Sequence, residues 1–295
     1  MGPEVAAASD AEFRMLTDLL RRHCGLHFGP ESRTLFERRV QRRVRELELT
    51  SIAAYHLLLR GAQGDRELAR LVDELTINET YFLRERGQLR ALVEEILPEL
   101  RGRHVGRPLT IWSAGCSSGE EPYSVVLLAQ EAGLVPGRDF RVYASDVSQR
   151  MLRRAREGVY REASFRETEP HLRERHFRAC EGGLRISDEL RQHVDFIHLN
   201  LFDESKLALL GAMDVILCRN VLIYFDAEGK RRTIATFFGR LRPGGYLLLG
   251  HAESLISLSS AFELRHLERE LVYRRPLGPR LWAGAGDAEA REVLT

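Results

Sequence analysis

The stretch TIWSAGCSSGEEPYSVVLLAQE, from Thr110 to Glu131, constrains the fold more than any other part of the sequence. Its apolar opening predicts a buried strand, the run from Gly115 to Gly119 a tight turn, and the remainder a helix. A strand, a glycine-containing turn and a helix in this order form the unit that holds nucleotide-like cofactors in open sheets. We therefore expect an α/β domain with a ligand site at this turn.

Two acids, Glu120 and Glu121, stand in the first turn of this helix, after Ser117 and Ser118, which we expect to cap it. A turn that binds phosphate offers bare N–H groups or a lysine, so two carboxylates indicate a ligand with cationic or hydroxyl groups. The alternative interpretation is a helix whose acids only offset the positive end of its dipole. This stretch alone leaves both interpretations open.

Length and periodicity divide the 295-residue chain into parts. Ser9 and Glu12 predict a capping box, and helical patterns follow it, whereas strands and helices alternate after Pro108. The Glu- and Arg-rich run before the third predicted strand is too long for a simple crossover loop. We expect an all-α domain at 9–85, a linker helix at 86–107, an α/β domain at 108–276 with an inserted subdomain at about 158–194, and a flexible tail at 277–295.

The second predicted helix, ESRTLFERRVQRRVRELE, has a basic face formed by Arg38, Arg42 and Arg45, roughly opposite its apolar side. Six arginines between Arg33 and Arg45 have only Glu37 as a compensating acid within that run. This face should attract an acidic partner, although the net charge of the whole chain is only +1. The alternative is an ordinary solvated helix face.

Polar and aromatic residues alternate in the segment TINETYFLRER, which joins the two predicted domains. An extended segment with this pattern would turn Asn78, Thr80, Phe82 and Arg84 to one side, which suits a loop that lines a site. The alternative is an interdomain linker in which the arginine has no role.

Polar residues also follow the predicted strands of the α/β domain. Asp146 ends the strand FRVYASD, where a carboxylate is placed to accept hydrogen bonds from ribose hydroxyls, unless it only caps the next helix. Ligands of open sheets bind outside the carboxyl ends of the strands. We therefore expect one crevice that gathers Gly115, Glu121, Asp146, Asn200 and Asn220.

Several classes of protein are excluded by the composition. The four cysteines show neither a CxxC pair nor a histidine at ligand spacing, so no zinc site, other metal site or disulfide framework is expected. No apolar run reaches the roughly 18 residues of a membrane span, and no leader is recognised. The near-neutral charge gives no general attraction to nucleic acid or membranes. A cytoplasmic protein is expected.

Three separated motifs resemble those of the CheR family of chemotaxis receptor methyltransferases: NETYFLR, SAGCSSGEEPYS and LCRNVLIYF, with PGGYLLLGHAES as a further match. Together they cover most of the chain. The resemblance implies a Rossmann-like class I methyltransferase sheet with a small all-α N-terminal domain and a small inserted β-containing subdomain. It also implies S-adenosylmethionine as methyl donor and glutamate side chains in the cytoplasmic helices of membrane receptors as acceptors, which become glutamyl methyl esters.

By motif position, the resemblance assigns roles to individual residues. Glu121 would meet the amino group of the donor, Asp146 the ribose, and Asn200 with Leu201 the adenine. Arg84 would orient the carboxylate of the acceptor or that of the donor, and Tyr224 would shape the path of the methyl group. No general base or metal is required, because a carboxylate is already ionised at pH 7 and in-line positioning supplies most of the rate. The cofactor contacts implied are Asn78, Thr80, Arg84, Glu121, Asp146, Asn200, Leu201, Arg219 and Asn220.

The resemblance also gives the basic helix a partner, because Arg38, Arg42 and Arg45 would dock on a Glu-rich receptor helix. The loop between Phe177 and Leu184 is shorter than in family members that bind a receptor's C-terminal pentapeptide, so we expect a pentapeptide-independent monomer. Two alternatives stay open: an adaptor of this family that binds S-adenosylmethionine without turnover, and a class I methyltransferase with another acceptor. The sequence CRNVLIYF lacks the Asp/Asn-Pro-Pro-aromatic motif of enzymes that methylate nucleic-acid bases.

Overall fold

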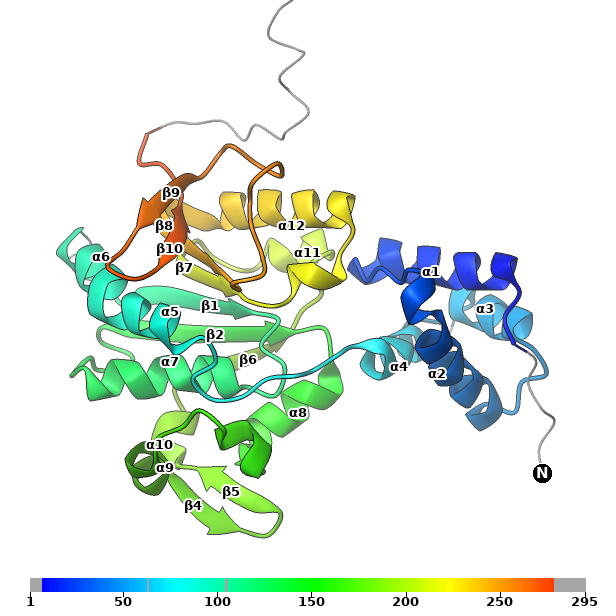
Figure 1. Cartoon of the computed structure of the whole chain (residues 1–295), viewed down its shortest axis with the longest axis horizontal. Coiled ribbons are helices and arrows are strands. Elements are labelled where there is room, and N and C mark those ends of the chain that lie inside the picture. The colour runs from blue at the N-terminus through cyan, green and yellow to red at the C-terminus, as the bar shows by residue number, and fades with distance from the viewer. Residues whose placement is uncertain (1–6, 63, 104–105, 279–295) are drawn as a thin grey trace, which may run out of the picture.

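The computed structural model describes residues 7–62, 64–103 and 106–278 and shows a helical domain beside a larger α/β domain (Figure 1). The segment 76–85 joins them. The predicted tail, 277–295, lies outside the described residues beyond Gly278. No helix in the described ranges combines the length and the apolarity that crossing a membrane requires. The helical domain contains α1 (Asp10–Cys24), the 3-10 turn η1 (Pro30–Ser32), α2 (Arg33–Glu46), α3 (Ile52–Arg60) and α4 (Gly64–Leu75).

Helix α1 shows how local sequence sets these boundaries. The Ser9 hydroxyl accepts the Glu12 N–H at 3.3 Å, and the Glu12 carboxylate accepts the Ser9 N–H at 2.9 Å, so the predicted capping box is confirmed. Gly25 ends the helix in the left-handed region, at φ +78°. The apolar face of α1, with Leu16 and Leu20, is fully buried against the other helices.

The α/β domain is built on a seven-stranded sheet in the order β6-β2-β1-β7-β8-β10-β9. The first five strands are parallel, and β10 and β9 are antiparallel, which confirms the predicted open, mostly parallel sheet. In the central register, Ile111 stands between Val142 and Val215. The strands are β1 (Leu109–Ala114), β2 (Phe140–Asp146), β6 (Val194–His198), β7 (Met213–Cys218), β8 (Leu241–Leu249), β9 (Glu263–His266) and β10 (Leu271–Arg274).

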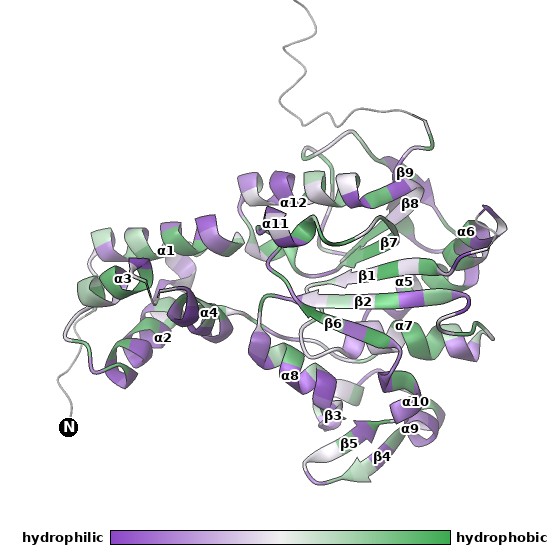
Figure 2. Ribbon diagram, turned by 180° about the vertical axis from the view of Figure 1, so that it is seen from behind, coloured by the Kyte–Doolittle hydropathy of each residue, from purple (hydrophilic) through white to green (hydrophobic). Residues whose placement is uncertain are grey.

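Helices cover both faces of this sheet because successive side chains of its strands point to opposite sides. Trp112 packs against Phe237 of α12 at a centroid distance of 5.5 Å, whereas its neighbour Ile111 belongs to the separate apolar cluster that contains residues of α5, α6 and α7. Figure 2 shows hydrophobic residues along the central strands and hydrophilic residues on outer helix faces. The helices are α5 (Arg86–Ala91), the π turn η2 (Leu92–Ile96), α6 (Leu97–Arg103), α7 (Glu120–Glu131), α8 (Gln149–Glu157), α11 (Glu204–Leu207) and α12 (Ala227–Arg240), with the 3-10 turn η4 (Leu222–Tyr224).

A three-stranded antiparallel sheet in the order β3-β5-β4 forms the core of the insert between α8 and β6. Figure 1 shows it as a separate small lobe below the main sheet. Its elements are β3 (Val159–Tyr160), η3 (Glu162–Phe165), α9 (Pro170–His176), β4 (Phe177–Cys180), β5 (Gly183–Ile186) and α10 (Asp188–Arg191).

The alternation predicts that Phe82 lies on the same side as Asn78, Thr80 and Arg84, and this prediction is wrong. The chain forms a turn at 82–85, and Phe82 is 1% exposed. Its ring packs against three aromatic rings of the insert at centroid distances of 4.8 to 5.3 Å: Tyr160, Phe165 and Phe177. Burial of this large ring and its edge-to-face contacts outweigh the local alternation.

Candidate active site

A cavity that opens to solvent lies at the carboxyl ends of β1, β2 and β7, where ligands of open sheets bind. Figure 1 shows the helical domain on the side to which the parallel strands point. All ten residues that the motifs indicate for the cofactor and for catalysis line this one cavity: Asn78, Thr80, Arg84, Glu121, Asp146, Asn200, Leu201, Arg219, Asn220 and Tyr224.

The glycine turn approaches this cavity more closely than a larger residue would allow. Gly115 has φ +83°, and a Cβ atom there would stand 2.4 Å from the Val221 side chain. The prediction that Ser117 and Ser118 cap α7 is wrong, because the N-cap is Gly119 at φ +93° and no side chain bonds there. The Ser117 N–H instead donates to Asp146 Oδ2 at 2.8 Å, which ties the turn to the end of β2.

The two acids after the turn face different surroundings. Glu120 is 2% exposed and accepts hydrogen bonds from Ser118 (2.7 Å) and Ser164 (3.0 Å), and burial raises the pKa of Glu120. It therefore links the turn to the insert, besides standing in the first helical turn. Glu121 lines the cavity and accepts from Ser113 Oγ at 2.7 Å and from Arg219 Nη1 at 3.1 Å. Glu121 is thus the acid that a ligand in the cavity meets.

Asp146, at the end of β2, lines the cavity next to the glycine turn. Its two carboxylate oxygens accept the N–H groups of Ser117 and Ser148, each at 2.8 Å. Burial raises the pKa of Asp146, while these hydrogen bonds oppose that effect. The helix cap of α8 is Ser148, whose hydroxyl accepts the Met151 N–H at 3.1 Å. Asp146 therefore lines the cavity and is not the N-cap of α8.

Arg219 is a buried bridge, with its side chain 2% exposed. Its Nη1 lies 3.1 Å from Glu121, and its Nη2 lies 3.1 Å from Glu85 and also donates to the Arg84 carbonyl. Burial by itself would raise the pKa of Glu85, but the charge and hydrogen bond of Arg219 outweigh it and hold that pKa below its ordinary value. Sequence reasoning missed Glu85, although it follows Arg84 directly.

Glu253 organises the loop after β7, and sequence reasoning missed it as well. Its carboxylate accepts the N–H groups of Asn220 (2.8 Å), Val221 (2.9 Å), Ile223 (3.2 Å) and Gly250 (2.8 Å). Burial raises the pKa of Glu253, and these hydrogen bonds oppose that effect. The available signal was the motif PGGYLLLGHAES, which contains this residue. Glu253 therefore fixes the loop that carries Asn220 and Tyr224.

The helical domain contributes to the cavity through the end of α1, which the sequence did not indicate. Cys24 and Leu26 are among the lining residues. The Asn200 side-chain amide donates to the His23 carbonyl at 2.6 Å across 177 residues of sequence. The His27 N–H donates to the Tyr224 carbonyl at 2.9 Å. Both domains thus build the site and hold its loops.

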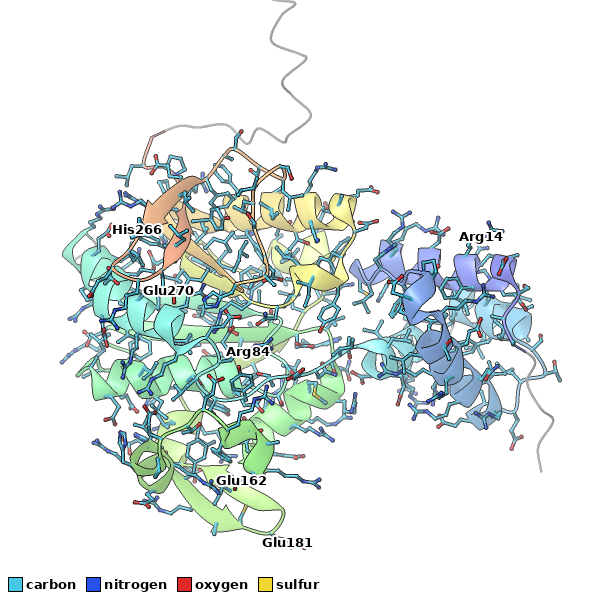
Figure 3. All side chains as sticks on the ribbon, viewed as in Figure 1. Arg14, Arg84, Glu162, Glu181, His266 and Glu270 are labelled. Carbon is cyan, nitrogen blue, oxygen red and sulfur yellow. The ribbon has the colours of Figure 1, made fainter. Side chains whose placement is uncertain are left out.

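Figure 3 shows Arg84 on the α/β domain, near the central strands of the sheet. Its Nη1 donates to the Glu79 carbonyl at 3.0 Å, and its guanidinium stands 5.7 Å from the Tyr81 ring centroid. Burial raises the pKa of Tyr224, so its hydroxyl stays protonated at neutral pH and remains a hydrogen-bond donor. Both side chains are available to a second reactant in the cavity.

The basic face of α2 lies outside the cavity lining, with Arg38, Arg42 and Arg45 all exposed. Glu37 pairs with Arg33 within the helix, and acids of other segments also reach this helix in the folded chain. Arg42 pairs with Glu74, and within the described residues Arg38 has no acidic partner. The further acids that pair with α2 arginines are Asp10, Glu46 and Glu67.

The lining fits a cofactor that combines an apolar ring, hydroxyls and a cation. Ser117 Oγ and Asn220 Oδ1 are buried, and in the described structure neither has a hydrogen-bond partner, so a ligand can complete them. Apolar side chains offer a place for a flat ring, and Glu121 offers a negative charge. Within the described ranges, no group of three or more His, Cys, Asp or Glu residues is placed to hold a metal ion. The apolar lining residues include Leu26, Val147, Leu199, Leu201 and Phe225.

Comparison with known proteins agrees with this geometry. The family model "CheR methyltransferase, SAM binding domain" matches residues 78–271, and the model "CheR methyltransferase, all-alpha domain" matches residues 11–76. Chemotaxis protein methyltransferase 2 of Vibrio cholerae is 36% identical over 270 residues, which cover 91% of this chain and 94% of the relative. The chemotaxis protein methyltransferase of Escherichia coli K12 is 35% identical, with 89% of this chain and 91% of the relative covered.

Chemotaxis protein methyltransferase 1 of Pseudomonas aeruginosa is similar over an equal extent. It is 34% identical over 277 residues, which cover 91% of this chain and 99% of the relative. The family models span both domains, and these relatives match over nearly their full length. The chain therefore belongs to the CheR methyltransferase family, and it is an enzyme that uses S-adenosylmethionine as its methyl donor.

Proposed function

We propose that this protein methylates glutamate side chains in the cytoplasmic helical region of methyl-accepting chemotaxis receptors and yields glutamyl methyl esters. One observation carries the proposal: side chains of three separated family motifs line a single cavity. Two arginines, Arg84 and Arg219, are among them. S-adenosylhomocysteine is the second product, and the enzyme acts in the cytoplasm as a monomer.

Positioning of the two reactants is the main task of the residues in this cavity. When bound, S-adenosylmethionine supplies a methyl group on a sulfonium, which needs no further activation. Glu121 holds the amino group, Asp146 the ribose hydroxyls, and Asn200 with Leu201 the adenine. Arg84 orients the acceptor carboxylate, and the protonated Tyr224 hydroxyl shapes the path beside it. Alignment of this kind lowers a barrier by about 7 to 11 kcal/mol.

We assign the helical part, 9–85, to receptor docking, the helix run 86–107 to the connection, and 108–276 to catalysis, with the insert at 158–194. A direct assay tests the whole proposal: the protein, labelled S-adenosylmethionine and a receptor cytoplasmic fragment should give base-labile methyl esters on glutamate. A matched fragment with glutamine at those positions should take up no label. Label on another class of acceptor would instead favour a different class I methyltransferase.

Charge reversal on α2 should weaken receptor binding. Arg38→Glu with Arg45→Glu removes two exposed positive charges, and each exposed pair is worth about 0 to 1 kcal/mol. We expect KM for the receptor fragment to rise about tenfold at low ionic strength, and the difference to shrink with salt because of screening. Arg42→Glu should raise KM less than Arg38→Glu or Arg45→Glu alone, because Arg42 already pairs with Glu74.

The measurement is initial rate against receptor concentration at several salt concentrations, with the affinity for S-adenosylmethionine as control. Arg269→Glu is a matched reversal of an exposed arginine at the β9–β10 hairpin and should leave KM unchanged. A receptor KM that ignores both salt and the α2 reversals would remove the docking role of this helix.

The β4–β5 hairpin supports pentapeptide independence. Only Glu181 and Gly182 separate the two strands, and Figure 3 places Glu181 at the tip of the hairpin, away from Arg84. A connection this short leaves no extended loop to enclose a peptide. We expect calorimetric titration with a receptor C-terminal pentapeptide to give no measurable heat, whereas micromolar binding would contradict this assignment.

A further inference from the structure

Glu85 ends a chain of three charged side chains that begins inside the cavity. Glu121 lies on the cavity wall, Arg219 stands behind it, and Glu85 lies beyond Arg219, with 3.1 Å separating each charged pair. The side chains are 15%, 2% and 14% exposed, in that order, so water screens these charges poorly. Glu85 is absent from the cavity lining and touches the ligand space only through Arg219 and Asn220.

The backbone at Glu85 is held in an unfavourable conformation. Glu85 has φ 51°, and Leu83 has φ 62°, both in the left-handed region that residues with side chains seldom adopt. Surrounding contacts fix this segment: the Leu83 N–H donates to Ser124 Oγ at 3.0 Å, and the Phe82 N–H donates to the Ser164 carbonyl at 2.9 Å. Strain that is held in place in this way commonly marks functional segments.

The charge balance of this chain differs with and without Glu85. Two carboxylates flank one guanidinium, so these three side chains together carry one net negative charge. The lowered pKa of Glu85 keeps its carboxyl ionised at neutral pH. Without that carboxylate, Arg219 would cancel the charge of Glu121, and this wall of the cavity would be neutral. The other charged side chains that line the cavity are those of Glu79, Arg84 and Asp146, and they are the same in both cases.

We propose that Glu85 is a positioning residue that neutralises Arg219, leaves Glu121 its negative charge for the donor's amino group, and so favours the cationic donor over the neutral product. S-adenosylmethionine has an ammonium, a carboxylate and a sulfonium, with net charge +1, whereas S-adenosylhomocysteine lacks the sulfonium charge. A negative wall therefore attracts the donor more than the product. The inference rests on the proposed contact of Glu121 with the donor's amino group and is independent of the receptor assignment.

The test is calorimetric binding of both ligands to the whole protein and its Glu85→Gln variant. We expect the affinity for S-adenosylmethionine to fall about tenfold or more, because the substitution neutralises one buried ion-pair partner. The affinity for S-adenosylhomocysteine should fall less, so the ratio of the two affinities should change by about threefold or more. Equal losses for both ligands, or no loss, would overturn the proposal.

Three further variants separate charge from structure. Glu85→Asp keeps the charge and should keep the affinity ratio, whatever its absolute affinities. Glu94→Gln, the same change at an exposed position of the following helix run, should leave both affinities unchanged. The double variant Glu85→Gln with Arg219→Gln again leaves one negative charge, on Glu121, and should restore the ratio toward that of the native protein. A double variant whose ratio stays at the value of Glu85→Gln would refute the charge argument even if folding is weakened.

Discussion

Turnover of the Arg84→Ala variant with saturating S-adenosylmethionine should be about 100-fold lower than that of the native enzyme, or lower still. Of the described residues that line the cavity, Arg84 and Arg219 are the basic ones, and Arg219 is already paired with two carboxylates. Among the residues that the structure describes, the hydrogen-bond partner of the Arg84 guanidinium is the Glu79 carbonyl oxygen, which carries no charge. It is thus the charge that an incoming carboxylate meets.

Rapid-quench measurement of a single turnover isolates the methyl transfer from product release. Arg84→Lys keeps the charge but loses the planar guanidinium that matches a carboxylate. Its rate should therefore lie between those of the native enzyme and Arg84→Ala. Arg166→Ala is the matched control, because Arg166 also stands over the Tyr81 ring, at 3.7 Å, but lies outside the cavity lining. An Arg84→Ala enzyme with native donor affinity and native turnover would contradict the assignment.

Glu121→Gln should lower the affinity for S-adenosylmethionine about 100-fold, because it leaves a buried guanidinium short of a partner and turns an amide toward a cationic ligand. One carboxylate oxygen of Glu121 accepts a hydrogen bond from Ser113, and the other accepts one from Arg219, so both oxygens must be acceptors. Isothermal calorimetry gives the affinity directly. In the proposed role, the loss appears in donor binding before any acceptor is added.

The neighbouring acid provides the control for this prediction. Glu120→Gln makes the same change at the adjacent residue, whose carboxyl group faces Ser118 and Ser164 rather than the cavity. Donor affinity should therefore stay within about twofold of the native value. Thermal unfolding without ligand shows whether either variant loses stability. If the two variants lost donor affinity equally, the separate roles of Glu120 and Glu121 would be wrong.

Sequence periodicity was sufficient for the sheet and for the location of the crevice. The apolar runs that end at Ala114, Asp146 and Cys218 form parallel neighbouring strands, and in any such sheet their carboxyl ends meet at one edge. The residues just after those runs therefore come together whatever the loops do. This part of the site depends on backbone geometry alone, which local patterns specify well.

Other parts of the site depend on contacts between distant segments, which local patterns do not specify. Phe82 turns away from its neighbours because three aromatic rings of the insert receive it, and these rings follow it by some 80 to 95 residues in the sequence. Glu253 looks like an ordinary surface acid until the loop after β7 brings four N–H groups to it. Cys24 and Leu26 reach the cavity only through the packing of the two domains.

The hydrogen bonds from His23 and His27, at and just after the end of α1, to Asn200 and Tyr224 join the helical domain to two residues that line the cavity. If α2 is the docking surface, this joint sets a constant offset between the docking point and the reacting methyl group. A receptor helix would then be read at a fixed register rather than searched freely. Because a helix rises about 1.5 Å per residue, a slide of about 10.5 Å would present the glutamate seven positions along on nearly the same face. Spacing along the receptor, more than local sequence, would decide which side chains are modified.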